Sequence, residues 1–513
     1  MLQSFIKNKF SKSISLRLFS HVLPRVGLDI AEPLIFEQGL EGCIGVDIED
    51  RDPNVKHRLG DLQRTSKIGL PNLNEVQVVR HFSKLSRYNY GLDTGLYPLG
   101  SCTMKYNPRI NEVVCRIPSL LNSHPFLPTD AVQGSLGLIH RLAQDLLKIT
   151  GMNSICMSPA AGAHGELCAM QTIAQAHQKQ GNTHKKYVLI PDAAHGTNPA
   201  TCTMAGFKVR VVKSTKDGKI DFEDFKKKCK DDVAGAMITN PNTCGLFEKD
   251  ICKIADLLHE KGAYLFMDGA NMNALMGRVF VSDLGIDAMH MNLHKTFSTP
   301  HGSSGPGSGP VVFSEKLTKY APIPFISKEG DEFKTTEIDE TGNSFGRMKA
   351  YYGQIGIHAR TLAYILAMGN GLAAVSGDAV LNANYLKHKL QDTISVGFPN
   401  NKYCMHEVLF CERFLKNTTI TTLDFAKAMI DAGFHPPTIY FPLVVHGAML
   451  MEPTESESKE SLDDYCKTMI NIAKLAVSGK HDEEFHNTPM AAPIRRTDET
   501  RAAKFPILTY QEK

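Results

Sequence analysis

A series of short apolar runs, each followed by a turn or a polar residue, most constrains how this chain can fold. The runs 186–190, 207–213, 234–239 and 263–267 are rich in Val, Ile, Leu, Met and Tyr, and helical patterns such as 251–261 separate them. Strands that alternate with helices form a mostly parallel sheet covered by helices. Ligands of such sheets bind at the carboxyl ends of the strands. The sequence therefore predicts an α/β fold with its functional residues just after the strands.

Polar residues that can take part in catalysis or ligand binding follow these runs. His195, Asn240, Asn242 and Asp268 each follow a predicted strand, and Lys295 follows a short run that begins at position 287. A buried carboxylate such as Asp268 needs a cation, which a protonated pyridine nitrogen or an arginine can supply. The amine of Lys295 can form a Schiff base with an aldehyde. The structural alternatives are a surface lysine in a glycine-rich loop and a histidine with a purely structural role.

A turn of small residues, Ala161, Gly162 and Ala163, opens directly onto a predicted helix. Small residues let the backbone approach a ligand, and the free N–H groups of a helix N-terminus bind anions. Taken alone, this is also what a plain tight turn looks like. Together with Asp268 and Lys295 it predicts a pyridoxal phosphate (PLP) site, because PLP needs a phosphate cradle, a carboxylate for its ring nitrogen and a lysine.

Several long segments resemble glycine dehydrogenase (decarboxylating), the P-protein family of the glycine cleavage system. They cover most of residues 30–500 and include LYPLGSCTMKYNPRINE, SPAAGAHGE, DAAHGTNPAT, TNPNTCGLFE, MDGANMNALMG and MNLHKTFSTPHGSSGPGSGPV. The resemblance implies a fold type I, aspartate-aminotransferase-like PLP enzyme with a large domain and a smaller carboxy-terminal α/β domain. The implied domain bounds are an arm at 29–125, a PLP-binding domain at 126–330, connecting helices at 331–385 and a small domain at 386–513.

The same resemblance implies a role for each site residue. Lys295 would carry the cofactor covalently, Asp268 would pair with the pyridine nitrogen and His195 would stack on the ring; these three are the expected catalytic residues. The turn Ala161–Ala163 would hold the phosphate. Either Asn240 or Asn242 would reach the ring hydroxyl, and Thr296 would complete the cofactor contacts. No metal is expected.

The chain resembles only the catalytic, carboxy-terminal half of the long form of the enzyme, which in many bacteria is a separate subunit 2. The resemblance implies a subunit 1 encoded separately, in a heterotetramer of two copies of each, with glycine as substrate and lipoylated H-protein as acceptor of the aminomethyl group. The alternatives are another fold type I decarboxylase or aminotransferase, and a non-catalytic scaffold half. The presence of Lys295 in its motif argues against the scaffold.

Composition and the N-terminus set further bounds. A formal net charge of +3 over 513 residues argues against a nucleic-acid surface, and no uninterrupted apolar run suggests a membrane span. Residues 1–28 are basic, rich in Ser and free of acidic residues, with Ile6, Phe10 and Ile14 on one helical face. This pattern is typical of a transit peptide and predicts import into the mitochondrial matrix or a related organelle.

Two polar segments are expected to contribute little to the core. Gly, Pro and Asn dominate the arm segment 95–112, which predicts a loop with Lys105 and Arg109 as exposed cations. With few apolar residues of its own, this loop is expected to need a partner surface to become ordered. The acidic segment 451–465 is expected to form solvated surface.

Overall fold

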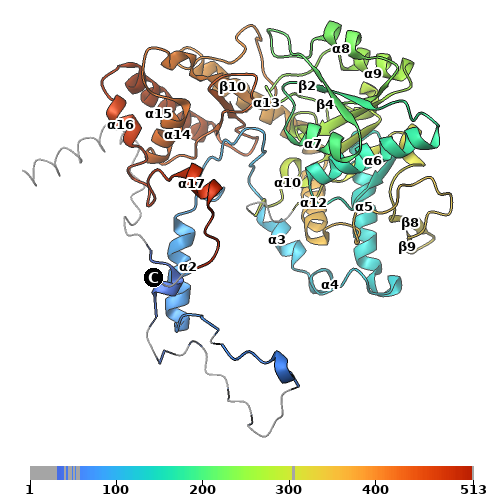
Figure 1. Ribbon diagram of the computed structural model, residues 1–513, viewed down its shortest axis with the longest axis horizontal. Helices are drawn as coiled ribbons and strands as arrows, with labels where there is room; N and C mark the ends of the chain where they lie inside the picture. The colour runs from blue at the N-terminus through green and yellow to red at the C-terminus, as the bar shows by residue number, and fades with distance from the viewer. Residues whose placement is uncertain are drawn as a thin grey trace, which may run out of the picture.

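The computed structural model describes residues 32–39, 42, 43, 45, 49, 52, 58–66, 68–302 and 307–510. The predicted transit peptide, residues 1–28, lies outside the described residues. Two lobes lie side by side, and the described residues before about position 90, drawn in blue, extend beneath them (Figure 1). One lobe is built on a seven-stranded sheet and the other on a three-stranded sheet.

The seven-stranded sheet has the order β1-β7-β6-β5-β4-β2-β3. Its strands are β1 (Ser154–Cys156), β2 (Tyr187–Pro191), β3 (Lys208–Val212), β4 (Val233–Thr239), β5 (Tyr264–Gly269), β6 (Ala288–Met291) and β7 (Val311–Phe313). β7 is antiparallel to both of its neighbours, and the other neighbouring pairs are parallel. The prediction of a mostly parallel sheet is confirmed.

Both faces of this sheet are buried, which explains why its strands are continuous apolar runs rather than alternating ones. On β5, Leu265 and Met267 belong to one core cluster, whereas Phe266 belongs to the cluster on the opposite face. α8 and α9 lie on one side of the strands in Figure 1, and α6 and α7 lie on the other. The helices of this lobe are α5 (Gln133–Thr150), α6 (Gly162–Lys179), α7 (Thr197–Met204), α8 (Phe222–Lys228) and α9 (Ile251–Glu260).

Local sequence signals set the ends of these helices. The side chain of Asp221 accepts hydrogen bonds from the N–H groups of Glu223 and Asp224 and so caps α8. α5 ends at Gly151, which has a left-handed φ of 73°. A side chain such as that of Asp221 satisfies free N–H groups at a helix start, and a glycine in the left-handed conformation ends a helix.

The smaller lobe contains the sheet β10-β12-β11, in which both pairings are antiparallel. Its strands are β10 (Val408–Cys411), β11 (Thr438–Ile439) and β12 (Ala448–Met451), and its helices are α13 (Leu372–Leu390), α14 (Thr422–Asp431), α15 (Lys459–Val477) and α16 (Asp482–Asn487). Val408 is paired with Met451, so the residues just before β10 and just after β12 are neighbours. This lobe is the predicted smaller α/β domain.

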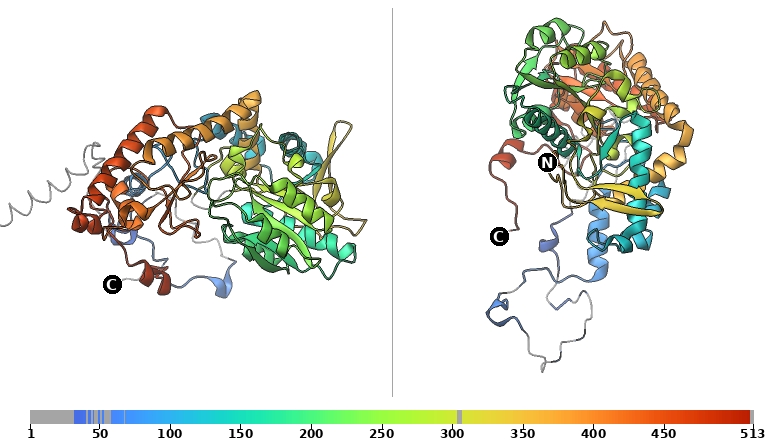
Figure 2. Two further views of the ribbon diagram at one scale, coloured as in Figure 1. Left: turned by 90° about the horizontal axis from the view of Figure 1, so that it is seen from above. Right: turned by 90° about the vertical axis from the view of Figure 1, so that its right-hand side faces the viewer.

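The remaining elements connect the two lobes or lie at their edges. A hairpin of β8 (Phe325–Glu329) and β9 (Glu332–Thr336) projects from the larger lobe beside α5 (Figures 1 and 2). The short helices are α2 (Glu75–Arg87), α3 (Arg109–Cys115), α4 (Pro118–Leu121), α10 (Leu293–Thr296), α11 (Glu315–Thr318) and α17 (Glu499–Lys504). α12 (Ile355–Met368) runs between the lobes to α13.

The helical run Ile355–Leu390 is long and apolar enough to cross a membrane by length and composition, with a mean hydropathy of 1.3. The 3-10 turn Gly369–Gly371 interrupts it. Its first half packs on α3 and α5, and its second half packs on α15 and β10. These contacts bury part of the run in the two lobes; 33% of its most apolar stretch is buried within the chain.

The arm segment 96–105 lies between the two lobes, and the prediction that Lys105 is an exposed cation is wrong. Leu99 forms a β-bridge with Met451, and the N–H of Gly100 donates to the carbonyl of Leu450 at 3.2 Å. The side chain of Lys105 is buried, with only 2% of its surface exposed, and its Nζ lies 2.7 Å from a carboxylate oxygen of Glu455. The segment is therefore held by contacts within this chain.

Candidate functional site

Lys295 lies at the carboxyl end of β6, on the single turn α10 rather than in the glycine-rich loop that the sequence suggested. Its Nζ donates a hydrogen bond of 2.9 Å to the backbone carbonyl of Ser101, a residue of the arm. Its side chain is half-buried, and its charge acts on groups from the ends of β2, β5 and β6 and from the smaller lobe. The amine therefore occupies the junction of both lobes and the arm.

Asp268, at the end of β5, is a buried carboxylate with polar neighbours around both of its oxygens. One oxygen accepts from the N–H of Ala270 at 2.9 Å, the other accepts from Nδ2 of Asn198 at 3.1 Å, and Nε2 of His290 lies 3.4 Å from the first. Burial alone raises the pKa of Asp268, but the charge of His290, these hydrogen bonds and the charge of Lys295 together lower it below its ordinary value. The carboxylate is therefore ionised and able to accept a further N–H donor.

His195 follows β2 and lies on the accessible side of the site. Its Nδ1 is 2.8 Å from Oγ1 of Thr197, and that hydroxyl donates to a carboxylate oxygen of Glu166 at 2.7 Å. Partial burial lowers the pKa of His195, so the ring is neutral at neutral pH. Burial, with Asp268 as a second cause, raises the pKa of Glu166 to about 7. Thr197 thus fixes the ring of His195 with a face left open.

The structure distinguishes between Asn240 and Asn242 as ligands of the cofactor, which the sequence alone could not do. All polar atoms of the Asn242 side chain are committed to its own loop, since it donates to Gly218 and Glu248 and accepts from Cys244 and Leu246. Asn240 accepts a hydrogen bond from the N–H of Glu248, but its buried Nδ2 has no partner among the described residues. Only Asn240 therefore has a donor left for a ligand.

The turn Ala161–Ala163 forms the N-terminus of α6, with Ala161 as its N-cap. A Cβ on Gly162 would lie 2.4 Å from Oδ1 of Asn292, and one on Gly309 would lie 2.0 Å from the carbonyl oxygen of Ala161. Small residues are therefore required here because the turn packs against the segments on either side of Lys295. The first N–H groups of α6 have no partner within the helix and remain free for an anion.

Several residues of this site carry no local signal in the sequence. Ser101 joins Lys295 to the smaller lobe, because its N–H donates to Oε2 of Glu407 at 2.8 Å while its carbonyl accepts from Lys295. Thr103 donates to Glu452 at 2.6 Å. Pairing between segments several hundred residues apart brings these groups together, so only a three-dimensional structure can place them. Thr296, in contrast, was expected and lies buried with an unpartnered hydroxyl.

Comparison with known proteins decides the family. Residues 375–493 match the model "Glycine dehydrogenase, C-terminal domain", and residues 163–337 match "Aminotransferase class-V". The chain is 51% identical to a probable glycine dehydrogenase (decarboxylating) subunit 2 of Caulobacter vibrioides over 94% of this chain and 93% of that one. The corresponding protein of Listeria innocua is 45% identical over 95% of this chain and 100% of that one. The chain belongs to the family of glycine dehydrogenase (decarboxylating) subunit 2.

Solved structures agree on the fold of this subunit 2 family member. An inhibitor-bound glycine decarboxylase (P-protein) superposes with a TM-score of 0.67 at 17% identity, covering 81% of this chain and 93% of that one. A cysteine desulfurase from Thermococcus onnurineus superposes with a TM-score of 0.56 at 14% identity, covering 76% of this chain and 96% of that one. At these identities the superpositions establish the fold, which is that of fold type I PLP enzymes.

PLP is the cofactor of this subunit 2 family member, and the residues at the strand ends fit it. The site offers the amine of Lys295, the ionised carboxylate of Asp268 for a pyridinium N–H and the free N–H groups at the start of α6. The unpartnered Nδ2 of Asn240 and hydroxyl of Thr296 are buried polar atoms that a ligand can satisfy. The donors and acceptors of the protein therefore match those of the cofactor.

The predicted mitochondrial location is wrong. The subunit 2 relatives that are 45% and 51% identical to this chain are proteins of Listeria and Caulobacter, which are bacteria. A basic segment rich in Ser is not specific enough to outweigh these matches.

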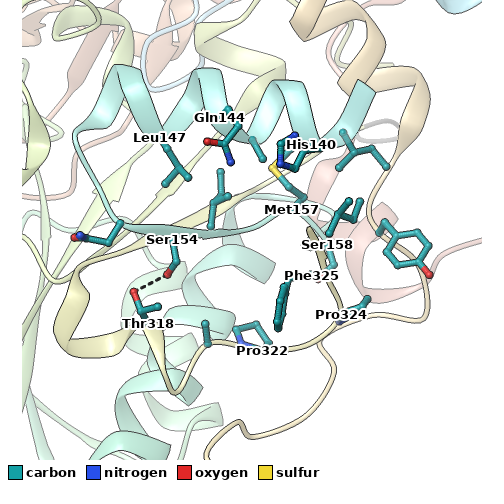
Figure 3. A pocket seen from close by; sticks show the side chains of 17 residues that line it. His140, Gln144, Leu147, Ser154, Met157, Ser158, Thr318, Pro322, Pro324 and Phe325 are labelled. Carbon is teal, nitrogen blue, oxygen red and sulfur yellow. Dashed lines mark hydrogen bonds between the residues drawn. The ribbon is translucent and has the colours of Figure 1, made fainter. Parts of the chain in front are cut away.

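A separate cavity of about 320 Å³ lies between α5 and the segment around residues 318–326 (Figure 3). Its lining is mainly apolar, with Leu147, Met157 and Phe325 pointing into it together with the polar side chains of His140 and Gln144. None of the described residues that line it is a predicted site residue. This cavity is therefore separate from the predicted site at the strand ends.

Proposed function

We propose that this chain is the cofactor-carrying subunit that decarboxylates glycine and transfers the remaining aminomethyl group to the lipoyl arm of H-protein. The observation that carries the proposal is the position of Lys295 on α10 at the end of β6, where its charge acts on the buried carboxylate of Asp268, in a chain of the subunit 2 family. Bound PLP supplies an electron sink for the electron pair that is freed when the carboxyl group leaves as CO₂.

The protein residues have distinct roles in this proposal. Lys295 holds the cofactor covalently, and Asp268 keeps a proton on the pyridine nitrogen through its buried negative charge. His195 is neutral and held by Thr197, so it packs against the ring as an uncharged surface. Of the two asparagines, Asn240 contacts the ring hydroxyl, because Asn242 has no free polar atom.

A protein partner covers part of this chain in the proposal. α2, α3, α4 and the turn after them expose large apolar side chains at 52–65% of their surface: Val76, Val79, Phe82, Ile110, Val113, Leu121 and Phe126. Large apolar side chains that gather on exposed helices are typical of protein interfaces. A bidentate ion pair between Arg360 and Glu112, at 2.7 and 2.9 Å, fixes α3 on α12. We assign this surface to subunit 1, in a heterotetramer with two copies of each subunit.

The covalent site is tested by reducing the PLP-loaded complex of both subunits with borohydride and mapping the labelled peptide. We expect the pyridoxyl group on Lys295 and none in Lys295→Ala, whose glycine–bicarbonate exchange should fall to background. Lys185→Ala is a control, because Lys185 is a buried lysine at the opposite edge of the sheet from the predicted site. Its Nζ donates to the backbone carbonyls of Asp231, Val233 and Lys261, near the amino-terminal ends of β4 and β5. Label on a lysine other than Lys295 would contradict the assignment.

The reaction is tested by omitting each component from the exchange assay in turn. We expect exchange of labelled bicarbonate into glycine only when this chain, subunit 1 and lipoylated H-protein are all present. Transamination of glycine, or decarboxylation that does not depend on H-protein, would favour the alternative of a different fold type I enzyme.

A further inference from the structure

Two carboxyl side chains from the smaller lobe are buried beside Lys295. Glu407 precedes β10 and Glu452 follows β12, and the pairing of Val408 with Met451 makes them neighbours. Carboxylate oxygens of both lie within 4.8 Å of one another and of a ring nitrogen of His406. All three side chains are 0% exposed. A carboxyl pair without access to water is costly when both groups are ionised.

The contacts of the two carboxyl groups differ. Glu407 accepts from the N–H of Ser101, whose carbonyl accepts from Lys295, so one residue links the carboxylate and the amine. Ser101 has a φ of 64°, an unusual conformation for a serine that lets its N–H and carbonyl serve these two partners. Glu452 accepts from Thr103 through one oxygen, while its other oxygen is buried and has no partner among the residues that the structure describes. The contacts favour a charge on Glu407 and a proton on Glu452.

The charges around the pair lead to the same assignment. Burial raises the pKa of Glu407 to about 7 and raises the pKa of Glu452 well above its ordinary value, with Glu407 as the second cause for Glu452. Burial lowers the pKa of His406 to about 3, so its ring is neutral and brings no positive charge. The titratable groups that face the pair from the arm, the strand ends and the smaller lobe are Lys295, His406, Cys102, Cys244, Cys404 and Glu455.

We propose that Glu407 and Glu452 share one proton and together form a counterion of single negative charge for Lys295. They are positioning residues, because they act on Lys295 through Ser101 and through space. Their charge favours a positive charge on the lysine nitrogen, and a positive nitrogen makes an attached carbon more susceptible to attack by an incoming amine. The inference rests on the proposed function in one respect, since it takes Lys295 as the residue that binds PLP.

The shared proton is tested without the cofactor, by infrared spectroscopy of the complex with subunit 1. At neutral pH, the difference spectrum between wild type and Glu452→Gln should contain the band of a protonated, buried carboxyl group. The bands of other buried carboxyl groups, such as Glu166 and Glu248, are present in both proteins and cancel. Glu248→Gln is the matched control, since Glu248 is also buried and burial also raises its pKa to about 7, but it contacts Asn242 rather than the arm. The absence of a protonated carboxyl band from this difference spectrum would overturn the shared proton.

The counterion is tested by titrating the absorbance of bound PLP with pH. The double variant E407Q/E452Q should shift the midpoint to lower pH by about one unit or more, because removing a negative charge disfavours the protonated nitrogen. Should the double variant fail to fold, Glu407→Gln alone should shift the midpoint in the same direction but by less than the double variant, because Glu452 can then take up the charge. Glu248→Gln should leave the midpoint unchanged. PLP bound to Lys295 with an unshifted midpoint overturns the inference alone, whereas PLP bound elsewhere overturns the proposed function.

A metal analysis of the wild-type complex separates the counterion from a cation site made of the same side chains. No stoichiometric divalent ion is expected, because Lys295 already supplies the positive charge. A tightly bound ion that is lost in Glu452→Gln would show that these residues ligate a metal and would overturn the proposal.

Discussion

The two sides of the site are built in different ways. On the larger lobe, His195, Asn240, Asp268 and Lys295 follow neighbouring strands of one buried sheet, and each is positioned by its own strand. On the other side, the arm and the smaller lobe meet through contacts between residues about 300 or more positions apart, such as that of Ser101 with Glu407. The sheet supplies groups that contact a ligand, and the arm sets the electrostatic conditions around them.

The sheet side is most sharply tested by Asp268→Asn, which should lower the exchange rate by about 1,000-fold through loss of a preorganised charge. The fold should survive, because asparagine can keep the hydrogen bond from Ala270. The exchange assay and a urea titration check the two expectations. Asp287→Asn is the matched control, since Asp287 is equally buried near the start of β6 and accepts from the N–H of Leu265 at 2.8 Å. An Asp268→Asn rate within a few-fold of wild type would make the carboxylate structural.

The arm side is tested by Lys105→Met. Lys105 is buried and donates to Glu455 and Asn273, so its removal leaves a carboxylate poorly compensated. The loss of one partner of a buried pair should lower the free energy of unfolding by about 3–5 kcal/mol. Urea unfolding measures it, and the double variant K105M/E455Q should recover part of the loss. An unchanged stability would mean that the arm is not locked by this pair.

The buried Glu248 behind Asn242 predicts a pH effect on stability. Burial raises its pKa from 4.5 to about 7 in the folded protein, so the folded state binds the proton more tightly than the unfolded chain. Its contribution is present below pH 4.5 and is lost as the pH rises through 7. Relative to Glu248→Gln, the wild type should lose on the order of 3 kcal/mol over this window. Urea unfolding of both proteins across the window checks it; parallel curves would contradict the shift.

The smallest effect is expected from Arg109→Ala, in the same arm as Lys105. The ion pair of Arg109 with Asp93 is short, at 2.7 Å, but the two side chains are 67% and 61% exposed. Water screens such a pair, so the urea midpoint should not change measurably. A clear loss of stability in Arg109→Ala would show that burial is not what distinguishes the two cations.

The sequence predicts one side of the site far better than the other, for a physical reason. Strand ends are read from local patterns, so the positions of Asp268 and Lys295 follow from the apolar runs before them. Lys105 and Glu452 were expected at the surface because their neighbours are polar, yet both are buried. Burial of a charged residue in a polar segment depends on a distant partner, which no local pattern contains. The choice between Asn240 and Asn242 likewise required the hydrogen bonds of the folded loop.

The link between Ser101 and Glu407 has a consequence for the synthesis of the protein. The two residues are 306 positions apart, and Lys105 and Glu455 are 350 apart. When a ribosome has completed the seven-stranded sheet, the chain already contains Lys295 and Asp268, but the carboxyl groups that complete their surroundings have not yet been translated. Such long-range contacts form late and slowly. A nascent or truncated chain can therefore hold the sheet residues of the site before it can hold the site itself.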